Sequence, residues 1–243
     1  MLELNKIYCE DCLTGMQKID DKSIDCVICD LPYGTTKCSW DIILPFDKLW
    51  EQYDRIVKPN GAIVLFGQEP FSSLLRLSNI KNYRYDLYWQ KERLTNIQQV
   101  KRRVGKDIET ISIFYRSQCT YNPQMVEYNG PKRSNKIGKG KLGKLTDDGE
   151  KKPKEYNDIG LRYPTQLLKF QRDILTSNLH PTQKPVKLVE WLIKTYTNEN
   201  DVVLDNCMGS GTTAVACLNT KRNFIGFENN EDYYQVANER IRI

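Results

Sequence analysis

One stretch near the C-terminal end of the chain decides the fold: Val202-Val203-Leu204-Asp205-Asn206-Cys207-Met208-Gly209-Ser210-Gly211-Thr212. It begins with three apolar residues and an acid, a pattern that predicts a short buried strand. Two glycines then predict a tight turn, and the small residues at 212–218 predict a helix. A strand, a glycine-rich turn and a helix in this order predict a ligand-binding unit of an α/β sheet. The glycines let a ligand approach the backbone, and the helix N-terminus offers free N–H groups.

The residues around this turn limit what the ligand can be. No lysine follows Gly211 directly, so the phosphate-binding loop of nucleoside triphosphatases is absent. Ala214 stands where the dinucleotide-binding pattern prefers its third glycine. An acid, Glu228, ends the next predicted strand (223–227), where the hydroxyl groups of a ribose would lie. The unit therefore predicts a ribose-bearing ligand without a large phosphate group.

The rest of the chain alternates short apolar strands with amphipathic helices, which is typical of an α/β sheet. The predicted strands cover 24–29, 62–66, 84–89 and 110–115, and the predicted helices cover 46–57, 70–77, 186–196 and 231–241. The first of these strands runs into Asp30-Leu31-Pro32-Tyr33, at the kind of strand end where open sheets bind ligands. A carboxylate, a backbone carbonyl and an aromatic plane together suit an exocyclic amine on a planar base. Taken alone, such a tetrad is more often a strand cap and a turn.

Length and composition exclude several other classes of protein. With 243 residues the chain is about one domain, and its 36 basic and 31 acidic residues give a net charge of +5. This charge permits a polyanionic partner without demanding one. A single histidine excludes zinc motifs built on a pair of histidines. No apolar run approaches the roughly 18 residues of a membrane span, and the N-terminus lacks the pattern of a signal peptide, so we expect a cytoplasmic protein.

Eight cysteines in such a chain are expected to be reduced thiols. Cys9 and Cys12 form one C-x-x-C pair, and Cys26 and Cys29 form a second, a spacing that approaches a zinc ribbon. The second pair lies in the predicted strand 24–29, where residues three apart point to opposite faces. We therefore predict small apolar core residues here and no bound metal.

The α/β pattern fails between residues 121 and 162. The segment 130–160 holds six glycines, nine basic and five acidic residues, and almost no large apolar side chains. A stretch of this length without regular structure usually carries a function or stays disordered. Its composition alone is equally compatible with a solvated loop that has no role.

Three segments in a fixed order resemble one known family: Asp30-Leu31-Pro32-Tyr33, His180-Pro181-Thr182-Gln183-Lys184-Pro185 and the turn 205–213. Over about residues 7–241, the chain resembles the β-class of amino-methylating DNA methyltransferases. Leu31 departs from the family by replacing the first proline of a D-P-P-Y tetrad, but only its backbone carbonyl is needed. The resemblance implies a single Rossmann-like methyltransferase domain (1–243). Its α/β sheet would be doubly wound, mostly parallel and circularly permuted, with a target-recognition insertion at about 90–170.

The resemblance also implies the reaction, which is methylation of the N6 amine of an adenine flipped out of duplex DNA. Asp30 and the carbonyl of Leu31 would hold the amine. Pro32 would stiffen the turn, and Tyr33 would stack on the base. The amine would attack the methyl group directly, without a covalent enzyme intermediate.

The cofactor implied by the resemblance is S-adenosylmethionine. Glu228 matches the acid that binds its ribose, Asp11 an acid at its adenine edge, and Lys184 the partner of its methionine carboxylate. His180 is expected to fix the loop geometry and not to act as a base. The residues that match the methionine-binding turn are Asp205, Gly209, Gly211 and Thr212.

Beside this resemblance, the positive charge of the insertion favours contact with the DNA backbone. Between residues 90 and 118, seven basic minus three acidic residues give +4. A homodimer and a cognate restriction endonuclease stay open as further partners, and no membrane partner is expected. The predicted DNA contacts are Lys101, Arg102, Arg103, Lys139, Lys141 and Lys144.

Three other activities stay open. A cytosine N4-methyltransferase uses the same chemistry, although such enzymes more often carry Ser where Asp30 stands. Methylation of RNA or of a protein side-chain amide is less compatible with the basic insertion and the order of the motifs. A catalytically silent DNA-binding protein, from a different class, is opposed by the intact Asp30, Tyr33, Gly209 and Gly211.

Overall fold

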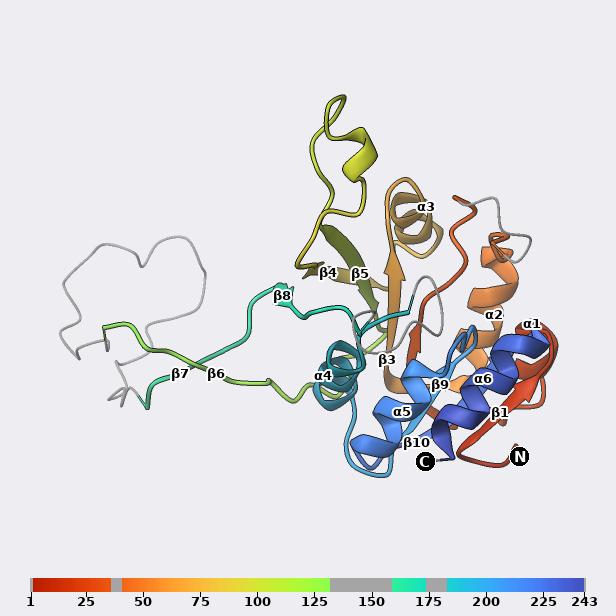
Figure 1. Ribbon diagram of the computed structural model, residues 1–243. Helices are drawn as coiled ribbons and strands as arrows, with labels where there is room; N and C mark the ends of the chain where they lie inside the picture. Colours follow the sequence, from red (N-terminus) through yellow and green to blue (C-terminus); the bar gives the residue numbers. More distant parts are fainter. Residues whose placement is uncertain (1, 36–40, 132–158, 174–182, 243) are drawn as a thin grey trace. The chain divides into compact units, whose positions relative to one another are not determined.

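The computed structural model describes residues 2–35, 41–131, 159–173 and 183–242 (Figure 1). Within these ranges, no helix is both long and apolar enough to cross a membrane. Three of the predicted DNA contacts lie outside them, namely Lys139, Lys141 and Lys144, and so does His180.

Eight strands form one sheet in the order β1-β10-β9-β2-β3-β5-β4-β8. The first five strands in this order (β1, β10, β9, β2 and β3) run parallel to one another. β5 is antiparallel to both β3 and β4, and β8 is parallel to β4. The predicted mostly parallel sheet in permuted order is therefore confirmed. The strands are β1 (Lys6–Cys9), β2 (Ile24–Cys29), β3 (Val57–Gly67), β4 (Tyr83–Gln90), β5 (Ile108–Phe114), β8 (Leu167–Lys169), β9 (Val202–Asp205) and β10 (Asn223–Glu228).

Helices cover both faces of the sheet, which confirms the doubly wound fold. Cys26 and Ile28 of β2 belong to a core with α4, α5 and α6, whereas Val27 and Cys29 belong to a second core with α1, α2 and α3. The helices are α1 (Cys12–Met16), α2 (Phe46–Ile56), α3 (Phe71–Ser78), α4 (Val186–Tyr196), α5 (Thr212–Asn219) and α6 (Glu231–Ile241).

The second predicted C-x-x-C pair is divided between these two cores. Because Cys26 and Cys29 face opposite sides of the sheet, they cannot ligate the same ion. The cysteines in the described part of the chain are free thiols. No group of three or more metal-ligating side chains is placed to hold an ion among the residues that the structure describes.

The strand order reverses between β2 and β9, which is where open α/β sheets bind their ligands. From β2 the chain continues to β3 on one side, and from β9 it continues to β10 on the other. Cys26 pairs with Val203 in the parallel register of these two strands. The carboxyl ends of β2 and β9 therefore meet at one edge of the sheet. Asp30 directly follows the end of β2, and Asp205 is the last residue of β9.

Two segments of the predicted insertion (90–170) leave the sheet. Residues 91–107, defined here as the arm, connect β4 to β5 and contain one 3-10 turn, η1 (Ile97–Gln99). Figure 1 shows the arm, in yellow, extending beyond the ends of these strands. Pro123–Pro164 is a second compact unit, in which β6 (Val126–Glu127) pairs antiparallel with β7 (Leu161–Arg162). In this unit the Arg162 guanidinium lies 4.2 Å from the centre of the Tyr128 ring.

Candidate active site

One cavity of about 510 Å³ joins the two predicted sites. Its wall includes the tetrad after β2, the turn after β9, the end of β10 and Lys184, which shortly precedes α4. Gly211 is the predicted cofactor residue that does not line it. The predicted residues in the lining are Asp11, Asp30, Leu31, Pro32, Tyr33, Lys184, Asp205, Gly209, Thr212 and Glu228.

The tetrad presents a carboxylate beside a fixed aromatic ring. The Tyr33 hydroxyl donates a hydrogen bond to Asp30 Oδ1. The Tyr33 ring packs against Phe71, with the ring centres 5.0 Å apart. The Leu31 side chain is buried in the core on that side of the sheet. The leucine that replaces proline at this position therefore contributes its side chain to the core.

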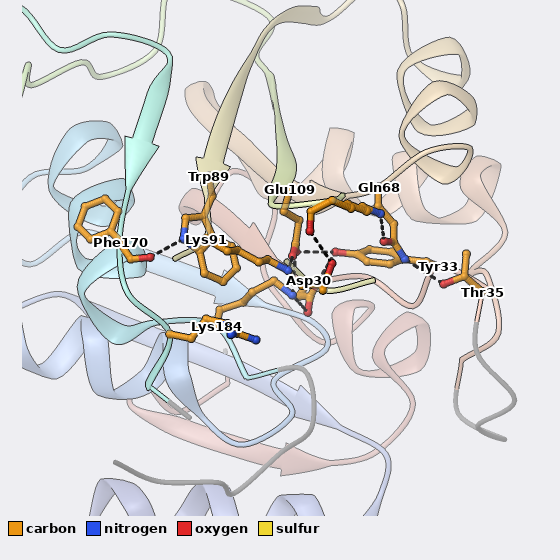
Figure 2. Close-up of polar contacts among 12 residues, drawn as sticks. Asp30, Tyr33, Thr35, Gln68, Trp89, Lys91, Glu109, Phe170 and Lys184 are labelled. Atoms are coloured by element: carbon orange, nitrogen blue, oxygen red, sulfur yellow. Dashed lines mark hydrogen bonds and ion pairs between the residues drawn. The ribbon is translucent and has the colours of Figure 1, made fainter. Parts of the chain in front are cut away.

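Three further side chains join Asp30 in a network that the sequence did not predict as a unit (Figure 2). The Lys184 ammonium pairs with Asp30 and lies 3.1 Å from Glu109 Oε1. Lys91 Nζ lies 2.6 Å from Glu109 Oε2, so negative and positive charges alternate along the network. The Tyr33 hydroxyl lies 3.4 Å from Glu109 Oε1. Neither Glu109 nor Lys91 was among the predicted site residues.

Burial and mutual attraction together set the protonation of this network. Burial alone would raise the pKa of Glu109, but the ammonium groups of Lys184 and Lys91 hold that pKa below its ordinary value. Burial alone would lower the pKa of Lys184, but Asp30 and Glu109 hold it above its ordinary value. Burial and the negative charge of Glu109 raise the pKa of Asp30, against the attraction of Lys184. Glu109 and Lys184 are therefore both charged at neutral pH.

Asp205 organises the turn after β9. Its carboxylate accepts a hydrogen bond from the Thr213 hydroxyl at 2.6 Å and another from the Cys207 N–H at 3.1 Å. Burial raises the pKa of Asp205 to about 6. The ionised carboxylate is thus held in the turn at a cost in stability.

This cost predicts a pH effect that can be measured. The ordinary pKa of Asp205 is 3.8, so its value of about 6 means that the folded state binds the proton more tightly. The free energy of unfolding of the wild type therefore falls as the pH rises from the ordinary pKa of 3.8 through the raised value of about 6. Between about pH 4 and pH 7, the unfolding free energy of Asp205→Asn should rise by about 2 kcal/mol relative to that of the wild type. Urea unfolding at both pH values measures this gain, and equal pH dependence in the two proteins would contradict it.

Glu228 ties the glycine turn to the end of β10. Its Oε2 accepts a hydrogen bond from the Gly209 N–H at 2.7 Å, and its Oε1 accepts one from the Asn230 N–H at 2.9 Å. Gly209 has a φ of +53°, a conformation that favours glycine. Gly211 has a φ of +81°, and a Cβ there would lie 3.0 Å from Ala237 Cβ. Gly211 is therefore explained by close packing against α6.

Two other predicted cofactor residues have structural partners. Asp11 caps α1, since its Oδ1 accepts hydrogen bonds from the Thr14 N–H at 2.9 Å and the Thr14 hydroxyl at 3.0 Å. Thr212 begins α5, and its hydroxyl accepts a hydrogen bond from the Arg240 guanidinium at 3.1 Å. Each can contact a ligand only in addition to these roles.

The arm carries half of the predicted DNA contacts, and its base borders the cavity. Lys101, Arg102 and Arg103 are exposed on it. At the base of the arm, Thr95 and Lys106 line the cavity. The exposed basic run and the cavity therefore share one structural element.

The geometry defines a class of site, in which a carboxylate able to accept hydrogen bonds from an amine and an aromatic ring share one cavity with a glycine-containing turn. The sequence matches the DNA methylase family (N6_N4_Mtase) over residues 24–239, and the chain belongs to this family. It is 29% identical to the Type II methyltransferase M1.MboII of Moraxella bovis, across 98% of this chain and 96% of that protein. It is 27% identical to the DNA adenine methyltransferase YhdJ of Escherichia coli (strain K12), across 99% of this chain and 84% of that protein.

Solved structures agree with this assignment. The crystal structure of an M1.HpyAVI–SAM complex is similar with a TM-score of 0.63 and 28% identity, over 97% of this chain and 98% of that one. The cytosine-N4-specific PvuII DNA methyltransferase is similar with a TM-score of 0.66 over 97% of this chain and 85% of that one. Its 18% identity shows a shared fold alone. The predicted family, fold and enzyme class are confirmed.

Proposed function

We propose that this chain transfers the methyl group of S-adenosylmethionine to the N6 amine of an adenine flipped out of duplex DNA. The observation that carries the proposal is the single cavity shared by Asp30, Tyr33 and Glu228. A relative described as a DNA adenine methyltransferase supports the choice of adenine. A structural neighbour described as a SAM complex supports the choice of cofactor.

The residues on the β9 and β10 side suit this cofactor. Glu228 offers a carboxylate to the ribose hydroxyls, and Asp11 offers one near the adenine edge. The cavity of about 510 Å³ falls within the usual range for a small-molecule site, roughly 300–1,000 Å³. When bound, S-adenosylmethionine supplies a methyl group on a positively charged sulfur.

The tetrad orients the amine that accepts this methyl group. Asp30 and the Leu31 carbonyl accept hydrogen bonds from the two N–H groups, which directs the nitrogen lone pair. The nitrogen would form a bond to the methyl carbon as the methyl–sulfur bond breaks, the bonding electrons would remain on the sulfur, and the proton that the nitrogen then loses would pass to solvent. It becomes positively charged during transfer, so the Asp30 carboxylate stabilises the transition state. Tyr33, supported from behind by Phe71, gives the base a stacking surface.

The proposal is tested by incubating the purified chain with unmethylated DNA and labelled S-adenosylmethionine. Digestion of the product to nucleosides should yield N6-methyldeoxyadenosine. N4-methyldeoxycytidine instead would establish the cytosine alternative, and an unmodified digest would leave a DNA-binding protein without activity. Long-read sequencing of the same product then reports the recognition sequence.

The proposed target-recognition region covers residues 90–170, inside a single methyltransferase domain (1–243). Its described parts are the arm, the second compact unit and the residues around β8. Positive charge on this region would hold the DNA backbone, while contacts to base edges would set the sequence. The charge on the arm supports this proposal because the arm borders the cavity.

The exposed basic run on the arm gives a testable consequence. Replacing Lys101, Arg102 and Arg103 with Gln should weaken binding to all DNA sequences alike, because each phosphate contact releases condensed counterions. The slope of log affinity against log salt should flatten by about one to three units, with cofactor affinity and the methylated sequence unchanged. Fluorescence anisotropy across a salt series measures both effects. Replacing Lys139, Lys141 and Lys144 with Gln tests the predicted loop in the same way. A triple variant that keeps the wild-type salt slope would show that its three replaced residues do not contact DNA.

Further partners and the location in the cell also belong to the proposal. A methyltransferase acting on cellular DNA would work in the cytoplasm of a bacterium, which cell fractionation tests. A homodimer would appear in sedimentation of the purified chain. A cognate restriction endonuclease would cleave the recognition sequence only in DNA that this chain has not methylated.

A further inference from the structure

We propose that Glu109 is a positioning residue, which shares the Lys184 ammonium with Asp30 so that Lys184 fixes the Asp30 carboxylate without cancelling its charge. The inference rests on the proposed function of the same cavity. It also gives Lys184 a role at the amine, in place of the contact with the methionine carboxylate that the resemblance implies.

The geometry of the network places Lys184 between two carboxylates. Its ammonium contacts Asp30 Oδ2 and lies 3.1 Å from Glu109 Oε1, and the side chains of Lys184 and Glu109 are each only 9% exposed. Figure 2 shows the side chains of Asp30, Lys184 and Glu109 converging from separate elements. Asp30 follows β2, Glu109 lies in β5 and Lys184 precedes α4. The three groups therefore keep this arrangement only if the elements stay packed.

The electrostatics of the network give Glu109 a defined effect. Asp30 and Lys184 alone would form a neutral pair, and the carboxylate would attract a developing positive charge weakly. Glu109 adds a negative charge on the other side of Lys184, so these three groups together carry one net negative charge. Lys91 balances that charge from the far side of Glu109, where it lies 2.6 Å from Oε2. The acceptor end of the network, Asp30, is the end that faces the amine in the proposed reaction.

The same groups also fix the direction of the acceptor. Lys184 holds Asp30 Oδ2, and the Tyr33 hydroxyl reaches both Asp30 Oδ1 and, at 3.4 Å, Glu109 Oε1. Without the charge on Glu109, Lys184 would have one carboxylate to bind in place of two. Asp30 would then be drawn toward Lys184 and away from the amine, and its charge would be more fully compensated. Methyl transfer would slow while the cofactor turn, formed by other residues, stays intact.

Glu109→Gln tests the proposal because it removes the charge and preserves the size of the side chain. In single-turnover experiments with saturating S-adenosylmethionine and duplex DNA, the methyl-transfer rate should fall by about 30-fold. Affinity for S-adenosylmethionine, measured by calorimetry, should change less than about twofold. Glu109→Asp, which restores the charge on a shorter side chain, should recover part of the lost rate.

The matched control is Asp86→Asn. Asp86 is also buried, pairs with Arg76 at 3.1 Å and accepts a hydrogen bond from the Ser112 hydroxyl at 2.7 Å. It lies on β4, next to the strand that carries Glu109, and is not among the described residues that line the cavity. Its loss should lower the melting temperature and leave the transfer rate at the wild-type value.

Each other result overturns the inference in a distinguishable way. A Glu109→Gln protein that transfers methyl groups at the wild-type rate would leave the network a purely structural one, as would no recovery in Glu109→Asp. A large loss of cofactor affinity at an unchanged transfer rate would show that Lys184 and Glu109 act in binding the cofactor and not in positioning Asp30. Failure of the wild-type chain to methylate DNA would overturn the proposed function together with this inference.

Discussion

Asp30→Ala should lower the rate of methyl transfer by at least about 100-fold, because it removes the charged acceptor that orients the target amine. In the structure Asp30 takes a hydrogen bond from Tyr33 and an ion pair from Lys184, so its carboxylate is held from two sides. The amine would lose both its alignment and the negative charge that opposes its developing positive charge. Single-turnover transfer of labelled methyl groups to duplex DNA measures the loss.

Two controls separate this effect from damage to the fold. Removing Asp30 leaves the Lys184 ammonium with Glu109 as its remaining carboxylate partner in the network, so the melting temperature should be recorded for the variant. Affinity for S-adenosylmethionine should fall much less than the rate, since the turn after β9 is built from other residues. A variant that folds and retains the wild-type rate would refute the assignment of Asp30 as the amine acceptor.

The two strand ends that carry the site could be predicted from the sequence because their signals are local. The apolar runs of β2 and β9 end in the structure at the predicted residues, Cys29 and Asp205. The carboxyl ends of parallel strands meet at one edge of a sheet, so both motifs had to face the same crevice once the strands were parallel. The fold and the two halves of the cavity follow from these facts.

Glu109 and Lys91 could not be found in the same way, because their positions depend on the direction of one strand. β5 runs antiparallel to β3, so its amino end lies at the edge where the parallel strands have their carboxyl ends. Glu109 near the start of β5 and Lys91 just after β4 are thereby brought to the cavity. The predicted strand at 110–115 was correct in kind, but no local signal indicated its direction.

The elements that the sequence did not predict are short and weakly apolar. β1 has four residues, of which Ile7 alone is buried, and α1 has five residues. β8 has three residues at the edge of the sheet, with Leu168 buried between two exposed neighbours. Segments of this length carry too few apolar positions to show a period. Their pairing with longer strands, and not their own pattern, gives them regular structure.

Glu228→Ala should weaken the binding of S-adenosylmethionine by about 10- to 100-fold, because two ribose hydroxyls lose a charged acceptor. The carboxylate is well placed for this role, since hydrogen bonds from the Gly209 and Asn230 N–H groups fix both of its oxygens at the cavity wall. Those same bonds mean that alanine also loosens the turn. Glu228→Gln removes the charge but keeps one acceptor oxygen, so it retains one of these two backbone hydrogen bonds and loosens the turn less than alanine does.

If the charge on Glu228 binds the ribose, calorimetry should show most of the affinity loss already in Glu228→Gln, with a smaller fall in melting temperature than in Glu228→Ala. If Glu228 only supports the turn, affinity and stability should fall together in both variants, and less in Glu228→Gln than in Glu228→Ala. Glu231→Ala provides the matched control, because this acid is exposed in the first turn of α6 and lies outside the described lining of the cavity. Unchanged affinity in all three variants would mean that the ribose lies elsewhere, and the acid at the end of β10 would then be a structural tie between that strand and the glycine turn.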